Sequence, residues 1–316
     1  DEQVEWTFPF AYKRCYFDQV MPETLAWMRL IDQVRPTFMT SLHNAELGGA
    51  FYYVNREDPE LFATLKALPQ RYGVALDAGE PEHASIRRLD TAIFQLPNMR
   101  DLYDYLEKLG QDPTRQIGGA SSDAYAEPYG TFCLAVELPY WWEPLSCDHT
   151  VTDTRYGTVL RETAEGIGEL HAVLAETLQE VTPDLVTNSP FLRATRFFVP
   201  TLATMAESDA LRAAGPEGDR PATVAERHSR RALVHCYRLR FGGMLLRALQ
   251  AEIAVGNGTP TIRRRTAAFE EIYAGWCAEA ESATPEKTIP IRHLVSIQYG
   301  TVLAGARRAA ARRGEV

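Results

Sequence analysis

The stretch TFCLAVEL, residues 131–138, decides the fold, because five consecutive apolar residues end there at the carboxylate of Glu137. A continuous apolar run of this length is typical of a central strand that is buried on both faces. Residues 37–42 form a second strand pattern that leads into His43, and the apolar residues 50–54 form a third. The sequence therefore predicts at least three neighbouring strands, two of which end at an ionisable side chain.

Helical patterns surround these strands. Pro22 and Glu23 suit the first turn of a helix, because proline lacks the unused N–H and a carboxylate complements the positive end of the helix dipole. The further predicted helices are 59–70, 84–94, 99–109, 155–181, 222–254, 261–281 and 290–313. Helices that alternate with apolar strands predict an α/β fold with a mixed β-sheet flanked by helices.

Two regimes of composition predict two domains. Residues 1–182 hold the strands, and we expect them to form the α/β domain. Residues 183–316 are rich in Ala, Leu, Glu and Arg and predict an all-α extension, with an exposed loop at 206–226. We expect this extension to support the fold or cover the active-site cleft and to supply no zinc ligand, because its histidines occur singly.

The composition excludes several classes of protein. The net charge of −9 argues against a nucleic-acid partner, which would require a basic face. The sequence has no apolar run near the roughly 18 residues of a membrane span, so we expect no membrane partner. Five scattered cysteines argue against a disulfide framework and favour a reduced, cytoplasmic setting. The oligomeric state stays open, and the absence of a starting Met predicts further residues upstream of Asp1.

His43 and Glu137 are the candidate functional residues, because the active sites of α/β sheets lie at the carboxyl ends of strands. Burial at the end of an apolar strand would raise the pKa of a carboxyl, which suits a general base near neutral pH. Histidine is the commonest zinc ligand. The alternative from the residues alone is a capping glutamate and a core histidine, and it stays open at this point.

Two stretches resemble the zinc metallocarboxypeptidase family. PETLAWMRLIDQVRPTFMTSLHNAELGGAFYYV (residues 22–54) resembles the segment that carries the family's last zinc-binding histidine. GGASSDAYAEPYGTFCLAVELPYW (residues 118–141) resembles the segment that leads to its catalytic glutamate. The resemblance covers roughly residues 5–145. It implies a carboxypeptidase-like sheet, a Zn²⁺ cofactor with His43 as a ligand, and Glu137 as the base that takes a proton from the zinc-bound water.

The resemblance also implies a substrate site. Asp123 matches an aspartate of the family motif, and Ser122 falls at the specificity-pocket position. Ser122 is neither acidic nor large, so a preference for basic C-terminal residues is not indicated. Arg115 falls where the family has a substrate-capping tyrosine, and its guanidinium would bind a carboxylate. Tyr125 is expected to line the cleft.

A zinc site of this type needs three protein ligands. In the family, an HxxE motif supplies two of them and precedes the strand that ends in the later histidine. No HxxE precedes His43, so we expect that motif and the carboxylate-binding arginine upstream of Asp1. The literal HxxE at 43–46 makes Glu46 a less favoured ligand. His83 is expected at an exposed helix start and not at the metal.

These features predict a zinc-dependent hydrolase that cleaves the C-terminal amide bond of a peptide or peptide-like small molecule. The first alternative is an amidase or deacylase of the desuccinylase type. The second is a non-catalytic binding protein with a degenerate metal site.

Overall fold

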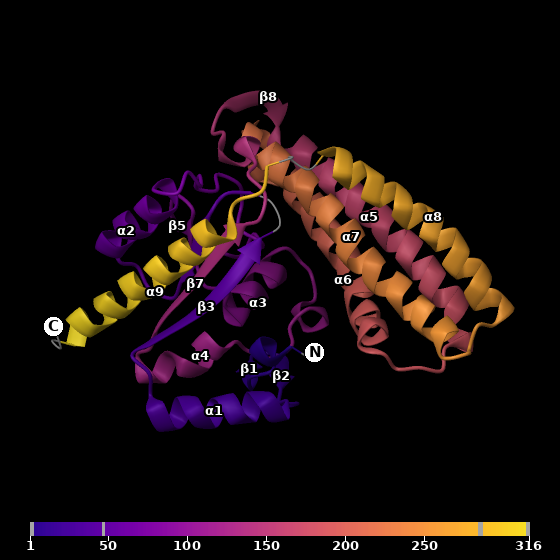
Figure 1. Ribbon diagram of the computed structural model, residues 1–316, viewed down its shortest axis with the longest axis horizontal. Helices are drawn as coiled ribbons and strands as arrows, with labels where there is room; N and C mark the ends of the chain where they lie inside the picture. The colour runs from indigo at the N-terminus through magenta and orange to yellow at the C-terminus, as the bar shows by residue number, and fades with distance from the viewer. Residues whose placement is uncertain (1–2, 46–47, 284–286, 314–316) are drawn as a thin grey trace. The chain divides into compact units, whose positions relative to one another are not determined.

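The chain forms two compact units (Figure 1), of which this computed structural model describes residues 3–45, 48–283 and 287–313. Unit 1 contains residues 1–149 and 285–316, and unit 2 contains residues 150–284. Unit 1 is therefore discontinuous in sequence, and neither division coincides with the expected boundary after residue 182.

Unit 1 is built on a mixed five-stranded sheet with the strand order β3-β7-β4-β6-β5. β3 lies parallel to β7, β4 is antiparallel to β7 and parallel to β6, and β5 is antiparallel to β6. This arrangement confirms an α/β fold with a mixed sheet. The strands are β3 (Phe38–Ala45), β4 (Phe51–Val54), β5 (Arg88–Asp90), β6 (Ile93–Gln95) and β7 (Phe132–Pro139).

The apolar run of β7 is buried along its whole length. Its even-numbered side chains, such as Leu134 and Val136, belong to a core that includes Leu65 of α2 and Leu294 of α9. Ala135 faces the opposite side of the sheet and packs with Tyr53 and Phe94. This alternation follows from the two-residue period of a strand. Burial on both faces explains why the run has no polar residue before Glu137.

Helices and short turns complete unit 1. Figure 1 shows α9 beside α2, and the two helices contact each other. On the other face, Trp27 of α1 and Tyr125 of α4 pack in the same core cluster as Met39 of β3. The elements are η1 (Val4–Trp6), β1 (Phe10–Tyr12), β2 (Cys15–Phe17), α1 (Pro22–Val34), α2 (Pro59–Gln70), α3 (Met99–Lys108), η2 (Pro113–Arg115), α4 (Ser122–Ala126), η3 (Glu127–Tyr129), η4 (Pro144–Cys147) and α9 (Ile291–Arg313).

Helix α9 is fastened to α2 by Asp58, which is 2% exposed. The Asp58 side chain caps α2 by accepting a hydrogen bond from Leu61 N at 3.3 Å. It also accepts hydrogen bonds from Arg308 at 2.5 Å and Arg312 at 2.9 Å. At Gly305, a side-chain Cβ would lie only 2.5 Å from the Phe38 ring, so glycine allows α9 to approach β3 closely.

Unit 2 is largely helical. Its four long helices are α5 (Tyr156–Val181), α6 (Pro190–Ala214), α7 (Val224–Ala254) and α8 (Pro260–Ala283), with the short turns η5 (Thr182–Asp184) and η6 (Pro216–Asp219). Leucines of α5, α6 and α7 meet in one apolar core. A two-stranded ladder of β8 (Val151–Arg155) and β9 (Pro221–Thr223) also belongs to this unit. The expectation of an all-α extension was therefore wrong in this detail.

Two further expectations need correction. The segment 84–94 was predicted as a helix, but it contains β5 and the start of β6. Ile93 and Phe94 are buried beside β4, and this tertiary pairing outweighs the local helical preference. The expected loop at 206–226 begins as the last turns of α6, because Asp209 and Arg212 form a buried ion pair there. In the part of the chain that the structure describes, no helix is long and apolar enough to cross a membrane.

Candidate functional site

The parallel pairing of β3 and β7 brings His43 and Glu137 together. The two residues lie directly opposite each other in the register of the strands. His43 Nδ1 is 3.4 Å from Glu137 Oε1. Both residues were predicted to end strands; the structure places them side by side near the carboxyl ends of β3 and β7, each of which continues for two more residues.

The two side chains have different environments. Glu137 is 8% exposed, whereas the side chain of His43 is 54% exposed. Partial burial lowers the pKa of His43, because it disfavours the charged form of the imidazole. Gln298 of α9 donates a hydrogen bond to the carbonyl oxygen of His43 at 3.0 Å, which fixes the backbone at this point.

Hydrogen bonds to Asp77 hold the backbone that precedes β4, the strand that pairs with β7 on the side opposite β3. Asp77 accepts hydrogen bonds from Gly49 N at 3.0 Å and from Gly79 N at 2.8 Å. A Cβ at Gly49 would lie 2.4 Å from the backbone nitrogen of Asp77, so only glycine allows this approach. The loop leads into β4, where Phe51 pairs with Glu137. Burial and the nearby carboxylates of Glu82 and Glu137 raise the pKa of Tyr53 well above its usual range.

The donors of a zinc site are incomplete among the described residues, which contain no group of three His, Cys, Asp or Glu side chains that could hold a metal ion. His43 and Glu137 provide two donors, which is fewer than the three that a catalytic zinc takes. Glu46, the less favoured ligand, lies outside the described residues. His83 Nδ1 is 2.8 Å from Ser85 Oγ and its ring packs edge-on against Tyr105.

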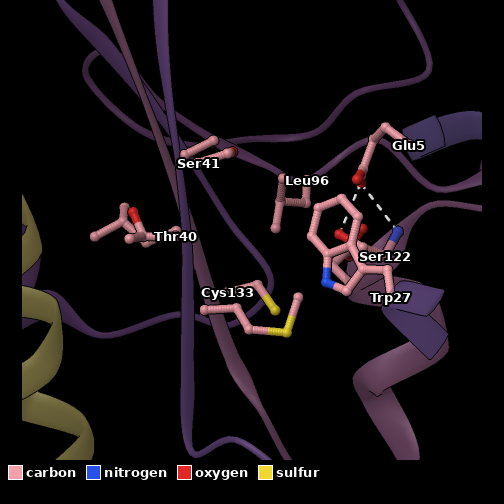
Figure 2. A pocket seen from close by; sticks show the side chains of 11 residues that line it. Glu5, Trp27, Thr40, Ser41, Leu96, Ser122 and Cys133 are labelled. Atoms are coloured by element: carbon pink, nitrogen blue, oxygen red, sulfur yellow. Dashed lines mark hydrogen bonds between the residues drawn. The ribbon is translucent and has the colours of Figure 1, made fainter. Parts of the chain in front are cut away.

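A cavity of about 140 Å³ lies on the same face of the sheet as this pair. Ser41 and Ala135 line it, and each precedes His43 or Glu137 by two residues on its strand. Side chains two residues apart point to the same face and are separated by about 7 Å. Figure 2 shows the cavity. Its other lining residues are Glu5, Trp27, Met39, Thr40, Leu96, Ser122, Asp123, Cys133 and Leu134.

The N-terminal segment closes one side of the cavity. Glu5 Oε1 accepts hydrogen bonds from Ser122 N and Ser122 Oγ, both at 2.9 Å (Figure 2). Phe8 forms a backbone bridge with Ala120, which holds the segment against the loop before α4. A Cβ at Gly119 would lie 2.6 Å from the carbonyl oxygen of Phe8. The glycine pair of the sequence motif thus allows the close approach that brings Glu5 to Ser122.

The other predicted substrate residues lie in different surroundings. Asp123 lines the cavity and accepts a hydrogen bond from Ser121 Oγ at 2.5 Å. Tyr125 is not among the lining residues described for the cavity; its hydroxyl donates to Asp32 Oδ1 at 3.0 Å and its ring packs against Phe8. Arg115 is exposed on η2 and is likewise not among the described lining residues.

Sequence reasoning missed Glu5 and Trp27. Glu5 precedes Ser122 by 117 residues, and no motif surrounds it. Trp27 was assigned to the apolar face of a helix, which is correct, but its ring also lines the cavity. The one available signal was the pair Gly118-Gly119, because consecutive glycines indicate a close approach of two backbones.

Comparison with known proteins gives no relative. No protein-family model matches the chain, and neither the curated proteins nor the solved structures include a significant match.

Proposed function

We propose that the chain is a hydrolase of peptide or peptide-like substrates with Glu137 as its general base. One observation carries the proposal: the buried side chain of Glu137 and the imidazole ring of His43 lie 3.4 Å apart, beside a cavity on the same sheet face. The resemblance of residues 22–54 and 118–141 to metallocarboxypeptidases supports the same assignment. We infer a carboxypeptidase-like arrangement of the sheet on this basis.

The chemistry requires one water molecule. The Glu137 carboxylate takes a proton from the water, whose oxygen then forms a bond to the substrate's carbonyl carbon. The C–N bond breaks, and the proton held by Glu137 passes to the leaving amine. The products are a carboxylic acid and an amine, so atoms and charge balance. The imidazole of His43 can orient the water or the carbonyl through one ring nitrogen.

Zinc remains part of the proposal through the resemblance alone, which makes His43 a ligand. A bound zinc would lower the pKa of its water and polarise the carbonyl. The donors available among the described residues do not form a complete site for it. The steps above therefore use only Glu137, His43 and water.

The size of the cavity indicates the class of substrate. A cavity of about 150 Å³ in another protein holds one benzene molecule, so the 140 Å³ found here suits a single side chain. Side chains two residues apart on one face of a strand are separated by roughly 7 Å. A substrate whose side chain fills the cavity would therefore have a neighbouring amide about this distance from the cavity, near Glu137. This geometry favours cleavage beside one recognised residue, as the proposed removal of a C-terminal residue requires.

Substitution of the base tests the assignment. Glu137→Gln should retain the fold and lose at least ~10²-fold in turnover of N-acyl dipeptides, because glutamine cannot accept the proton. Glu23→Gln is the matched control, since Glu23 is an exposed residue of the same unit. Turnover is measured with and without added zinc, on substrates with a free or an amidated C terminus. Equal turnover by wild type and Glu137→Gln would refute the role of Glu137, and a preference for amidated substrates would favour the desuccinylase-type alternative.

A binding protein is the second candidate. The lack of a three-donor group among the described residues favours it, because the cavity could then bind a ligand without hydrolysing it. Absence of turnover with every substrate and with added zinc, together with retained ligand binding, would establish this candidate.

A further inference from the structure

The cavity beside the His43–Glu137 pair has a lining that is unusual for a pocket of its size. Two carboxylates, those of Glu5 and Asp123, lie in it together with the indole ring of Trp27. Among the described residues, those that line the cavity include no lysine, arginine or histidine. The two carboxyl groups therefore have no cationic side chain beside them among the described residues that line the cavity.

The carboxylate of Glu5 is held firmly in place. Both hydrogen bonds from Ser122 reach Oε1, and Oε2 has no hydrogen-bonding partner among the described residues. Burial raises the pKa of Glu5, and burial also raises the pKa of Asp123. Burial disfavours the charged form of a carboxyl and the described lining residues supply only uncharged hydrogen-bond donors, so a bound cation would stabilise the ionised form of both groups.

The aromatic ring adds a second preference for a cation. Trp27 lines the same cavity as Glu5 and Ser122 (Figure 2). An indole face attracts an ammonium or guanidinium group, and tryptophan is the best of the aromatic residues at this. Met39 and Leu96 also line the cavity and supply apolar contacts. The lining thus matches an aliphatic chain that ends in a positive charge.

We propose that this cavity binds an organic cation of the size of a lysine or arginine side chain. The statement that this cation is the side chain of the substrate's C-terminal residue rests on the proposed function. From the sequence, Ser122 gave no indication of a basic preference. The charge comes instead from Glu5, which a distant segment delivers to the same position.

Binding of side-chain analogues tests the cavity without any turnover. The probes are n-butylammonium and n-propylguanidinium, with 1-butanol as the neutral analogue, and binding is measured by NMR titration of the whole chain. We expect both cations to bind at least about tenfold more tightly than 1-butanol, because charge-assisted hydrogen bonds are stronger than neutral ones. Equal affinity for the alcohol and the cations would overturn the proposal.

Two pairs of variants locate the binding. Glu5→Gln keeps an acceptor for Ser122 but removes the charge, and it should weaken cation binding about tenfold or more. Glu23→Gln, which changes an exposed glutamate, should leave cation binding unchanged. If Glu5→Gln does not fold, Asp123→Asn is compared with the exposed control Asp101→Asn. Unchanged cation affinity in the folded cavity variant would refute the assignment.

A final comparison separates this inference from the proposed function. Cation binding is repeated in Glu137→Gln, which lies outside the cavity lining described above and should bind the probes as the wild type does. Tight cation binding by a wild-type chain that turns over no substrate would leave the cation cavity intact and reject the hydrolase. Turnover without a preference for cations would do the reverse.

Discussion

Removal of the Asp58 side chain should weaken the attachment of α9 to α2. Asp58 is 2% exposed and has two tasks: it caps α2, and it accepts hydrogen bonds from Arg308 and Arg312. Loss of an aspartate cap costs about 1 kcal/mol. Loss of the two charged contacts adds about 1–2 kcal/mol, a value reduced from that of buried pairs because the arginine side chains are 32% and 39% exposed.

Asp58→Ala should therefore reduce the stability of unit 1 by about 2–3 kcal/mol, and Asp58→Asn by about 1–2 kcal/mol, because asparagine still caps the helix. The assay is urea denaturation, monitored by hydrogen exchange in peptides from α2 and α9. Exchange is needed because a chain with two units does not unfold in one two-state step. Arg308→Ala should show the same local effect, whereas Arg307→Ala, at an exposed position, should not.

The effect should also depend on pH. Burial raises the pKa of Asp58, but the hydrogen bonds from Arg308 and Leu61 outweigh it and the net pKa lies below the usual 3.8. A carboxyl whose pKa is lower in the folded state stabilises that state above its unfolded pKa, and this contribution is lost as the pH falls through the folded pKa. The difference between wild type and Asp58→Asn should thus be full at pH 7 and shrink below about pH 4. Equal stability of Asp58→Ala and Asp58→Asn at pH 7, or additive effects of Asp58→Ala and Arg308→Ala, would refute the reasoning.

Two other substitutions test packing in the two units. Gly305→Ala should lower the melting temperature of unit 1, because its Cβ would overlap the Phe38 ring and overpacking costs about 1–3 kcal/mol; Gly275→Ala, whose Cβ meets nothing within 4 Å, should not lower that of unit 2. Asp209→Ala removes the carboxylate shared by the buried Arg212 and by Arg230, while Arg212 keeps its contact with Glu217, and it should cost unit 2 about 1–3 kcal/mol by hydrogen exchange. The control Asp219→Ala, at a residue with an 82% exposed side chain, should change stability by under ~1 kcal/mol. Protection of α6 in Asp209→Ala equal to that in the control would contradict the assignment of this network.

Much of unit 1 could be predicted because its signals are local. The apolar run of 132–136 and its end at Glu137 are sufficient to identify β7. The helix that begins at Pro22 ends at Val34, and its C-cap residue Arg35 adopts a left-handed conformation directly before Pro36. The pairing of His43 with Glu137 could be anticipated only in that each residue was expected at the end of a strand, whereas β3 and β7 both continue two residues further. Their adjacency requires β3 and β7 to be neighbours, and no local pattern specifies strand order.

The features of the fold and the site that could not be predicted depend on contacts between residues that are far apart in sequence. Glu5 reaches Ser122 because the bridge between Phe8 and Ala120 aligns two distant segments. The segment 84–94 forms strands because Phe94 becomes buried beside β4. Helix α9 was predicted from its sequence, but its membership in unit 1 was not, because an amphipathic pattern does not identify the surface that it will cover.

The discontinuity of unit 1 also determines the order in which a nascent chain can fold. A ribosome releases β3 and β7 first, then all of residues 150–284, and only afterwards α9. Until Leu294 and Ile297 emerge, Leu134 and its neighbours lack part of their apolar cover. Domains fold as units during synthesis, so unit 2 can form before α9 has been synthesised and unit 1 is complete. A message cut short before residue 291 would therefore produce a chain with an uncovered sheet, which chaperones and proteases recognise.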